Sequence, residues 1–303
     1  MKIFISGGSG FIGQNLSKKL VSEGHSVTVL SRDLSKAKGV LGDEVSIIEG
    51  DPATVGDWQD QIDGHDGVVN LCGEAILAKK WTPERKKLIV DSRIVSTGNI
   101  VSAIKRASNK PGVLISGSAI GIYGDGGSDE LTEDSSEGDS FGAKLCHDWE
   151  EAANSATALG VRVVKIRTGD VLGKGGILAK METPFKIYLG GPFGSGKQYT
   201  SWIHIDDHVG IVIKILEDES ISGPVNLVAP NPVTGRQFAD ALGKALKKPS
   251  WFAVPKFTLD LMFGEGSELI LESKKALPKK MLDSGYRFKF ENLDKALADI
   301  YKN

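Results

Sequence analysis

The sequence predicts an α/β protein built on a doubly wound parallel sheet. Through the first half of the chain, short apolar runs without polar alternation alternate with helix-like segments. Strands of this kind are buried on both faces by helices. A glycine-rich turn, GGSGFIG, joins the first apolar run to the first helix. The 303 residues can bury a large core, as one large domain or two unequal ones.

The predicted strands follow from the apolar runs in chain order. The first, 2–6, precedes a helix predicted over 11–23, in which apolar residues recur every four positions and after which Gly24 suits the position just beyond a helix end. The remaining predicted strands are 27–30, 45–48, 67–71, 113–116, 161–166 and 225–228.

Two further helices and one irregular region complete the pattern. Thr82 and Pro83 predict the start of a long helix, as the N-cap and the first helical residue. A second helix is predicted over 141–159 because its apolar residues share one face. After Gly169 the pattern loosens into a glycine-rich stretch, and helical periodicity resumes over 202–216.

Composition limits the partners of the chain. Its formal net charge of −2 creates no overall field that attracts nucleic acid or an anionic membrane. No stretch approaches the roughly 18 apolar residues of a membrane-spanning helix. Two cysteines, Cys72 and Cys146, are too few for a disulfide framework and suit a reducing compartment. We therefore expect a cytoplasmic protein with a small-molecule substrate and no nucleic acid or membrane partner.

The glycine-rich turn predicts a dinucleotide site. Gly7, Gly10 and Gly13 follow a predicted strand and open a predicted helix, which is the context that makes this motif informative. Glycines permit a tight turn and close approach of the backbone, and the helix N-terminus presents amide donors to a pyrophosphate. A strand-to-helix turn without a ligand is the alternative.

The end of the second strand favours NADP(H) as the cofactor. NAD-binding proteins usually place a carboxylate there for the ribose hydroxyls, whereas this chain has Ser31 and Arg32. A guanidinium offers a planar fork of donors to a 2′-phosphate. Asp33 could support NAD instead, but capping of the next helix is the better interpretation of that residue. An exposed basic residue without a ligand is the alternative for Arg32.

Several motifs together resemble a known superfamily. GGSGFIG, SGSAIGIYG and WIHIDD are similar to the extended short-chain dehydrogenase/reductases, which include the sugar-nucleotide epimerases. NLCGEAI, KKWTPERKKLIVDSR, RTGDVLGKGG and KKALPKKMLDSGYRFKF resemble more specifically the atypical subgroup labelled "epimerase family protein". That subgroup is NAD-dependent epimerase/dehydratase-like and also bears the name of a cell-division-inhibitor-like nucleoside-diphosphate sugar epimerase. The resemblance runs nearly end to end and implies a Rossmann fold and an NADP-binding protein.

The resemblance also implies roles for individual residues. Asp51 is expected beside the adenine, Leu71 and Gly73 flanking ribose and phosphate, and Ser116 near the nicotinamide. Ser118 matches the superfamily's catalytic serine or threonine, and Tyr123 is expected on the substrate side. The full set of predicted cofactor-binding residues is Gly7, Ser9, Gly10, Phe11, Ile12, Gly13, Arg32, Asp51, Leu71, Gly73 and Ser116.

The superfamily's Tyr-x-x-x-Lys pair is missing. In that pair the lysine lowers the pKa of the tyrosine, so that the phenol exchanges a proton with the substrate. None of the five tyrosines is followed four residues later by lysine. Phe141 and Leu145 stand at the matching positions, and Lys144 is displaced by about 100° around a helix.

Other groups would have to handle the proton if the protein is an enzyme. Ser118, Tyr123 and Glu74 are the candidates, although Tyr123 also suits simple packing and Glu74 an ion pair with a neighbouring lysine. His204 and Asp206 are better interpreted as helix caps than as catalytic groups. His204 and His208 have a metal-ligand spacing but no evident third ligand, so we predict no metal site. Cys146 lies on an apolar helix face and is expected to be buried.

These observations predict a domain division and two alternative functions. Residues 1–170 form the predicted NADP-binding domain, completed by 197–229, and 230–303 with 171–196 form a smaller substrate-side domain. The leading hypothesis is an NADP(H)-dependent oxidoreductase or epimerase acting on a small, nucleotide-linked or similar molecule. The alternative is a non-catalytic NADP(H) sensor or binding protein. The oligomeric state is left open, a homo-oligomer included.

Overall fold

The computed structural model describes residues 1–302 and contains a sheet of seven parallel strands. Across the sheet the order is β11 (Gly223–Leu227), β7 (Arg162–Thr168), β5 (Val113–Ala119), β4 (Gly67–Asn70), β1 (Lys2–Ser6), β2 (Ser26–Ser31) and β3 (Ser46–Glu49). The chain winds outward from β1 to β3 and then returns to the other side of β1 with β4. Ligands of such sheets bind at this reversal, outside the carboxyl ends of the strands. The predicted doubly wound fold is confirmed.

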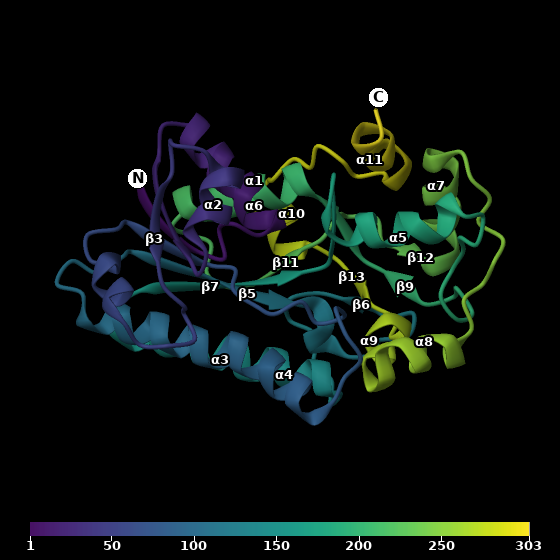
Figure 1. Cartoon of the computed structure of the whole chain (residues 1–303), viewed down its shortest axis with the longest axis horizontal. Helices are drawn as coiled ribbons and strands as arrows, with labels where there is room; N and C mark the ends of the chain where they lie inside the picture. Colours follow the sequence, from purple (N-terminus) through teal and green to yellow (C-terminus); the bar gives the residue numbers. More distant parts are fainter. Residues whose placement is uncertain (303) are drawn as a thin grey trace.

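Helices cover both faces of the sheet (Figure 1). On one side lie α1 (Phe11–Ser22), α2 (Leu34–Leu41) and α6 (Ile205–Glu217), and on the other α3 (Pro83–Arg106) and α4 (Phe141–Asn154). Alternate residues of β1 belong to different apolar clusters: Ile3 and Ile5 pack on the α1 and α6 side, and Phe4 packs on the α3 side. This two-residue alternation explains why the central strands are apolar throughout.

The helix starts that the sequence predicts are confirmed by their caps. The Thr82 hydroxyl accepts a hydrogen bond from the Arg85 backbone amide at 3.2 Å, with Pro83 as the first helical residue. Asp33 caps α2 by accepting the Lys36 amide at 2.9 Å. The helix predicted over 141–159 ends earlier, because its last five residues form a 3₁₀ turn (Ser155–Leu159).

Two predictions of secondary structure are wrong. The helix predicted over 202–216 begins only at Ile205, since β10 (Trp202–His204) pairs with β8 (Asp170–Leu172) as a short parallel ladder. The apolar Trp202 and Ile203 match a helical pattern and a buried strand equally well. The glycine-rich stretch also contains a helix, α5 (Gly176–Lys186), which the loosened pattern did not predict.

A separate apolar cluster lies at one end of the sheet. It joins Leu172 and α5 to α7 (Gly235–Leu246) and α11 (Leu293–Ile300), and Figure 1 shows α5, α7 and α11 gathered there. The domain division and the substrate-side role of this unit stay predictions. Within residues 1–302, no helix has both the length and the apolar character needed to cross a bilayer.

Candidate functional site

The glycine loop between β1 and α1 is built by close backbone contacts. Gly7 has φ of +80°, and a Cβ there would lie 2.8 Å from the Leu71 carbonyl carbon. A Cβ on Gly13 would lie 2.3 Å from the Gly7 carbonyl oxygen. Glycine is therefore required at both positions for α1 to lie this close to the loop and for the loop to lie this close to the end of β4.

The first turn of α1 is free to bind an anion. Its N-cap, Gly10, provides no side-chain hydrogen bond, and no acidic residue occupies the first turn. The amide groups at a helix start lack partners within the helix and carry its positive dipole end. The ring of Phe11 is covered by glycines of the 173–176 segment, whose Cβ atoms would lie 2.7 to 3.2 Å from it: Gly173, Gly175 and Gly176. The glycine-rich stretch thus packs on the predicted pyrophosphate site.

The predicted adenosine end lies beside the end of β2. Arg32 is exposed there, while Asp33 is engaged in capping α2. Asp51 follows β3, and its carboxylate accepts the Ala53 amide at 2.9 Å. Burial raises the pKa of the nearby Cys72 thiol to about 11, and the charges of both Arg32 and Asp51 act on it. The Gly50 amide donates to the Ser31 carbonyl oxygen at 3.0 Å, so the residues that follow, Arg32 and Asp51, lie at neighbouring strand ends on the carboxyl edge of the sheet.

The next part of the edge contains an arginine that the sequence did not single out. Arg93, on α3, lies against Gly73, whose Cβ would be 3.1 Å from the guanidinium carbon. The guanidinium donates a hydrogen bond to the Glu74 carbonyl oxygen at 3.1 Å and stacks 5.2 Å from the Trp149 ring centroid. Burial lowers the pKa of Arg93. Ser116, at the same edge on β5, is completely buried.

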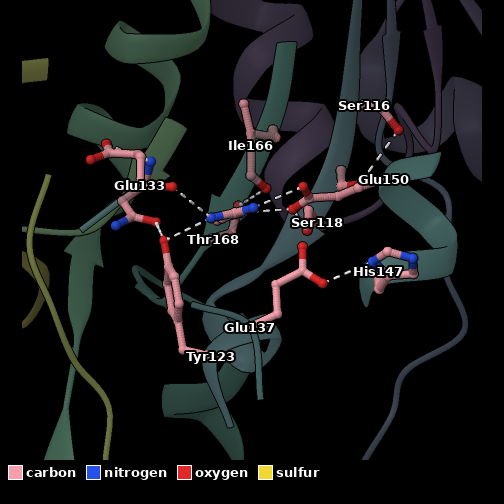
Figure 2. A network of polar contacts seen from close by, with 12 residues as sticks. Ser116, Ser118, Tyr123, Glu133, Glu137, His147, Glu150, Ile166 and Thr168 are labelled. Atoms are coloured by element: carbon pink, nitrogen blue, oxygen red, sulfur yellow. Dashed lines mark hydrogen bonds and ion pairs between the residues drawn. The ribbon is translucent and has the colours of Figure 1, made fainter. Parts of the chain in front are cut away.

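Ser118 and Tyr123 belong to one buried polar network, which Figure 2 shows. The Ser118 hydroxyl donates to Glu150 Oε1 at 2.7 Å. Arg167 donates to both oxygens of the same carboxylate, at 2.8 and 3.0 Å. It also donates to the Tyr123 hydroxyl at 3.1 Å, which in turn donates to Asn226 Oδ1 at 2.7 Å. The polar atoms of Ser118 and Tyr123 are thus engaged by protein groups.

The third candidate, Glu74, is also paired. Its carboxylate lies 2.9 Å from the buried guanidinium of Arg85 rather than beside a neighbouring lysine.

Burial raises the pKa of Tyr123, so its phenol stays protonated near neutral pH. The catalytic roles of Ser118, Tyr123 and Glu74 stay predictions, and each residue makes structural contacts that explain its position without catalysis.

An aromatic cluster fills the position of the missing tyrosine. The Phe141 ring meets Trp81 edge-on, with 5.0 Å between centroids, and Leu145 is buried in the same cluster. The Lys86 ammonium lies 5.0 Å from the Phe141 centroid and forms an ion pair with Glu265. A cation therefore does approach this position, from α3.

The remaining candidates have structural partners. His204 caps α6 by accepting the Asp206 amide at 3.1 Å, as predicted. His208 lies 3.2 Å from the Thr168 hydroxyl, and burial lowers its pKa to about 3. Cys146 is buried, with a thiol pKa raised to about 12. Over residues 1–302, no group of three or more His, Cys, Asp or Glu side chains is placed to hold a metal ion.

One hollow of the surface lies away from this edge. Its volume is 750 Å³, and its lining includes Met1, His65 and Asp66, which lie at the amino ends of the strands. A second hollow, of 360 Å³, is lined by Lys174, Gly175 and residues of the chain end. The candidate site is therefore defined by the strand ends and the glycine loop, because ligands of parallel sheets bind at the carboxyl edge.

Sequence reasoning missed the polar residues at the end of β7 and just beyond it. Arg167 and Asp170 lie at the same edge as Ser118, since β5 and β7 pair with Ser118 opposite Arg167. The available signal was the run Arg-Thr-Gly-Asp immediately after an apolar strand. Polar residues in that position meet at the carboxyl edge of a parallel sheet.

Comparison with known proteins identifies the family. Residues 3–227 match the NAD dependent epimerase/dehydratase family, and residues 254–300 match a domain of unknown function, DUF1731. The epimerase family protein SDR39U1 homolog of Arabidopsis thaliana chloroplasts is 39% identical over 305 residues, covering 99% of this chain and 86% of the relative. Epimerase family protein YfhF of Bacillus subtilis is 36% identical over 301 residues, covering 99% and 98%.

Comparison with solved structures supports the same family. The crystal structure of human epimerase family protein SDR39U1 with NADPH superimposes with a TM-score of 0.89 at 34% identity, covering 100% of both chains. A UDP-galactose 4-epimerase with 18% identity and a TM-score of 0.78 shares the fold. The resemblance inferred from the motifs is thus confirmed, and the chain belongs to the NAD dependent epimerase/dehydratase family as an NAD(P)-binding epimerase family protein.

Proposed function

We propose that this protein binds NADP(H) and uses it in the oxidoreduction or epimerisation of a small molecule, of which nucleotide-linked sugars are one class. The observation that carries the cofactor choice is the placement of Arg32. It is exposed at the end of β2, next to the strand end that Asp51 follows, while the adjacent carboxylate of Asp33 caps α2. The binding of NADPH by the related human protein supports the same choice.

Different residues along the edge of the sheet bind different parts of the cofactor. The first turn of α1 and the glycine loop receive the pyrophosphate, and Arg32 receives the 2′-phosphate as a charge-assisted donor. Leu71 and Gly73 flank the middle of the cofactor, and Ser116 lies toward its nicotinamide end. When bound, the nicotinamide supplies hydride exchange with the substrate. The chain's own task is then to orient the substrate and move a proton.

Arg32→Ala should remove most of the preference for NADPH over NADH. A hydrogen bond to a charged group contributes roughly 1.5–3 kcal/mol, so the wild type should bind NADPH about tenfold to a hundredfold more tightly than NADH. Titration calorimetry measures both affinities. Lys38→Ala, an exposed cation on the neighbouring helix, is the matched control and should keep the preference. Equal affinity of the wild type for both cofactors would overturn the assignment.

A second function remains supported by one observation: phenylalanine and leucine occupy the Tyr-Lys positions within an apolar cluster. On that basis the protein would be a non-catalytic NADP(H) sensor or binding protein. Turnover separates the two functions, since a sensor binds the cofactor without hydride exchange.

We expect no Tyr-Lys-type turnover of common sugar nucleotides by the wild type, and none from Phe141→Tyr alone. A new phenol keeps a pKa near 10 unless a cation is held beside it. Lys86 approaches the ring but is paired with Glu265. Only Phe141→Tyr combined with Leu145→Lys supplies the missing pair, and stopped-flow hydride transfer compares the variants. Turnover by Phe141→Tyr that disappears on adding Lys86→Met would show that Lys86 is already the required cation.

A further inference from the structure

Asp170 lies at the edge of the sheet where the nicotinamide end of the cofactor is expected. β7 pairs with β5 so that Thr168 is level with Ala119, and Asp170 comes two residues further along, at the start of β8. Three residues beyond Asp170, Gly173 lies so near Phe11, the first residue of α1, that an added Cβ would be 2.7 Å from its ring. Three residues of extended chain span at most about 11 Å, so Asp170 lies within about that distance of the chain segment that packs on the start of α1.

Within residues 1–302, the carboxylate of Asp170 receives no hydrogen bond from the protein, and its oxygens are not sealed from solvent. Part of the residue is accessible, while protein surrounds it deeply enough that burial raises its pKa to about 6. Over residues 1–302, no hydrogen bond contributes to this pKa; the one opposing influence is the charge of Lys274. A carboxyl group at the carboxyl edge of a parallel sheet, with a raised pKa and no donor from the protein, is a candidate functional group.

The charge of Lys274, from a distant part of the chain, acts on the Asp170 carboxyl group. The two residues flank Ser201, whose carbonyl oxygen accepts the Asp170 amide at 2.9 Å and whose hydroxyl donates to the Lys274 carbonyl oxygen at 2.8 Å. Ser201 also accepts the Ala276 amide at 2.9 Å, which fixes the Lys274 segment on the edge of β8 and β10. The Lys274 ammonium is itself buried and lies 2.6 Å from the Glu272 carboxylate.

We propose that Asp170 is the acid–base residue of this site, in place of the absent tyrosine, and that Lys274 is its positioning cation. This inference rests on the proposed function. In the oxidation direction a substrate alcohol gives its hydroxyl proton to the Asp170 carboxylate, while its carbon gives a hydride to NADP⁺. The alcohol becomes a carbonyl, two electrons pass to the cofactor, and the proton remains on Asp170. In the reverse direction the carbonyl carbon receives the hydride from the cofactor, and the carbonyl oxygen receives the proton from Asp170. The substrate is thus an alcohol or the carbonyl compound formed from it.

The other charged groups around Asp170 do not serve this role. Arg167, near the end of β7, is paired with Glu150. His208, on α6, is neutral because burial lowers its pKa to about 3. Glu272 lies beside the ammonium of Lys274, and its negative charge weakens the electrostatic effect of Lys274 on Asp170. Asp170 is therefore the open carboxyl group of this edge, with Lys274 as the charge that acts on it.

The test uses the cofactors alone. A carboxylate beside the nicotinamide feels the positive ring of NADP⁺ but not the neutral ring of NADPH. An opposite charge within about 4–6 Å lowers a carboxyl pKa by about one unit or more, so NADP⁺ affinity should rise about tenfold, relative to NADPH, from pH 5 to 7. The 2′-phosphate also titrates near pH 6, but it is common to both cofactors, so NADPH serves as the reference.

Calorimetry of the full chain in two buffers of different ionisation enthalpy should show proton release on NADP⁺ binding near pH 6 that exceeds the release on NADPH binding. Asp170→Asn should abolish this excess, and Asp43→Asn, an exposed carboxylate, should keep it. Lys274→Met should move the excess to higher pH, because the pKa of Asp170 rises without the cation. This second variant decides the question if Asp170→Asn does not fold.

Failure of the proposed function and failure of the inference about Asp170 give different results. If the wild type binds neither cofactor, the proposed function is wrong and this inference falls with it. If both cofactors bind but the excess proton release is absent, or is equal in the wild type, Asp170→Asn and Lys274→Met, then the proposed function stands and Asp170 is not the acid–base residue. A purely structural ion pair predicts this last outcome.

Discussion

Glu150→Ala should lower the free energy of unfolding by about 3–5 kcal/mol, because it leaves a buried guanidinium without its partner. Arg167 and Glu150 are only 5% and 4% exposed, and two hydrogen bonds join them side by side. Burial alone would lower the pKa of Arg167, but the Glu150 carboxylate and the Tyr123 hydroxyl raise it above its ordinary value. Without Glu150 this support is lost, but the guanidinium stays charged because arginine ordinarily titrates far above neutral pH.

Urea denaturation measures this effect, with two controls. Glu151→Ala removes a neighbouring exposed carboxylate and should change stability by no more than about 0.5 kcal/mol. Ser118→Ala removes one donor to Glu150 and should have an intermediate effect of roughly 1–3 kcal/mol. A loss below about 1 kcal/mol for Glu150→Ala would mean that water or another group replaces the carboxylate. The network would then not be what holds the ends of β5 and β7 together.

The fold could be predicted from the sequence because its signals are local. Each central strand is an apolar run bounded by polar residues or glycine, and α2 and α3 have their capping side chains within three residues of the amides they bind. The prediction over 202–216 was wrong because a three-residue strand leads directly into a helix. Its partner, β8, lies some thirty residues earlier, and only tertiary pairing separates the two elements.

The candidate site was likewise predictable where its sequence signals are local, and not where it depends on contacts between distant parts of the chain. The glycine loop and Arg32 are short motifs next to predicted strands, and the structure places them along one edge. The polar network was not predictable, since Tyr123 meets an asparagine 103 residues later and Asn226 meets a glutamate 93 residues earlier. Asp170 and Lys274 are likewise far apart in the chain. Their proximity depends on how the C-terminal segment lies on Ser201, which no sequence pattern indicates.

Gly13→Ala should abolish measurable NADPH binding, with a rise in Kd of more than about a hundredfold, because it forces the glycine loop apart. The new methyl group would lie 2.3 Å from the Gly7 carbonyl oxygen and 2.5 Å from Gly8 Cα. Both neighbours are backbone atoms and cannot turn aside as a flexible side chain would. Overpacking of this kind costs about 1–3 kcal/mol, so the melting temperature should fall as well.

Two matched glycines separate the loop geometry from a general effect of alanine. Gly39, in α2, has no atom within 4 Å of an added Cβ, so Gly39→Ala should stabilise the fold by about 0.5–1 kcal/mol and leave binding unchanged. Gly10 has φ of −76°, which alanine adopts readily, and its Cβ would lie 3.3 Å from the Gly7 carbonyl oxygen.

Gly10→Ala should therefore keep the wild-type melting temperature within a few degrees but weaken NADPH binding, since its methyl group would stand where the pyrophosphate approaches α1. Thermal unfolding and fluorescence titration of NADPH measure the two quantities in the same samples. If Gly13→Ala bound NADPH as tightly as Gly39→Ala, the cofactor would not depend on the close approach of α1 to the loop. The pyrophosphate would then have to bind away from the helix start.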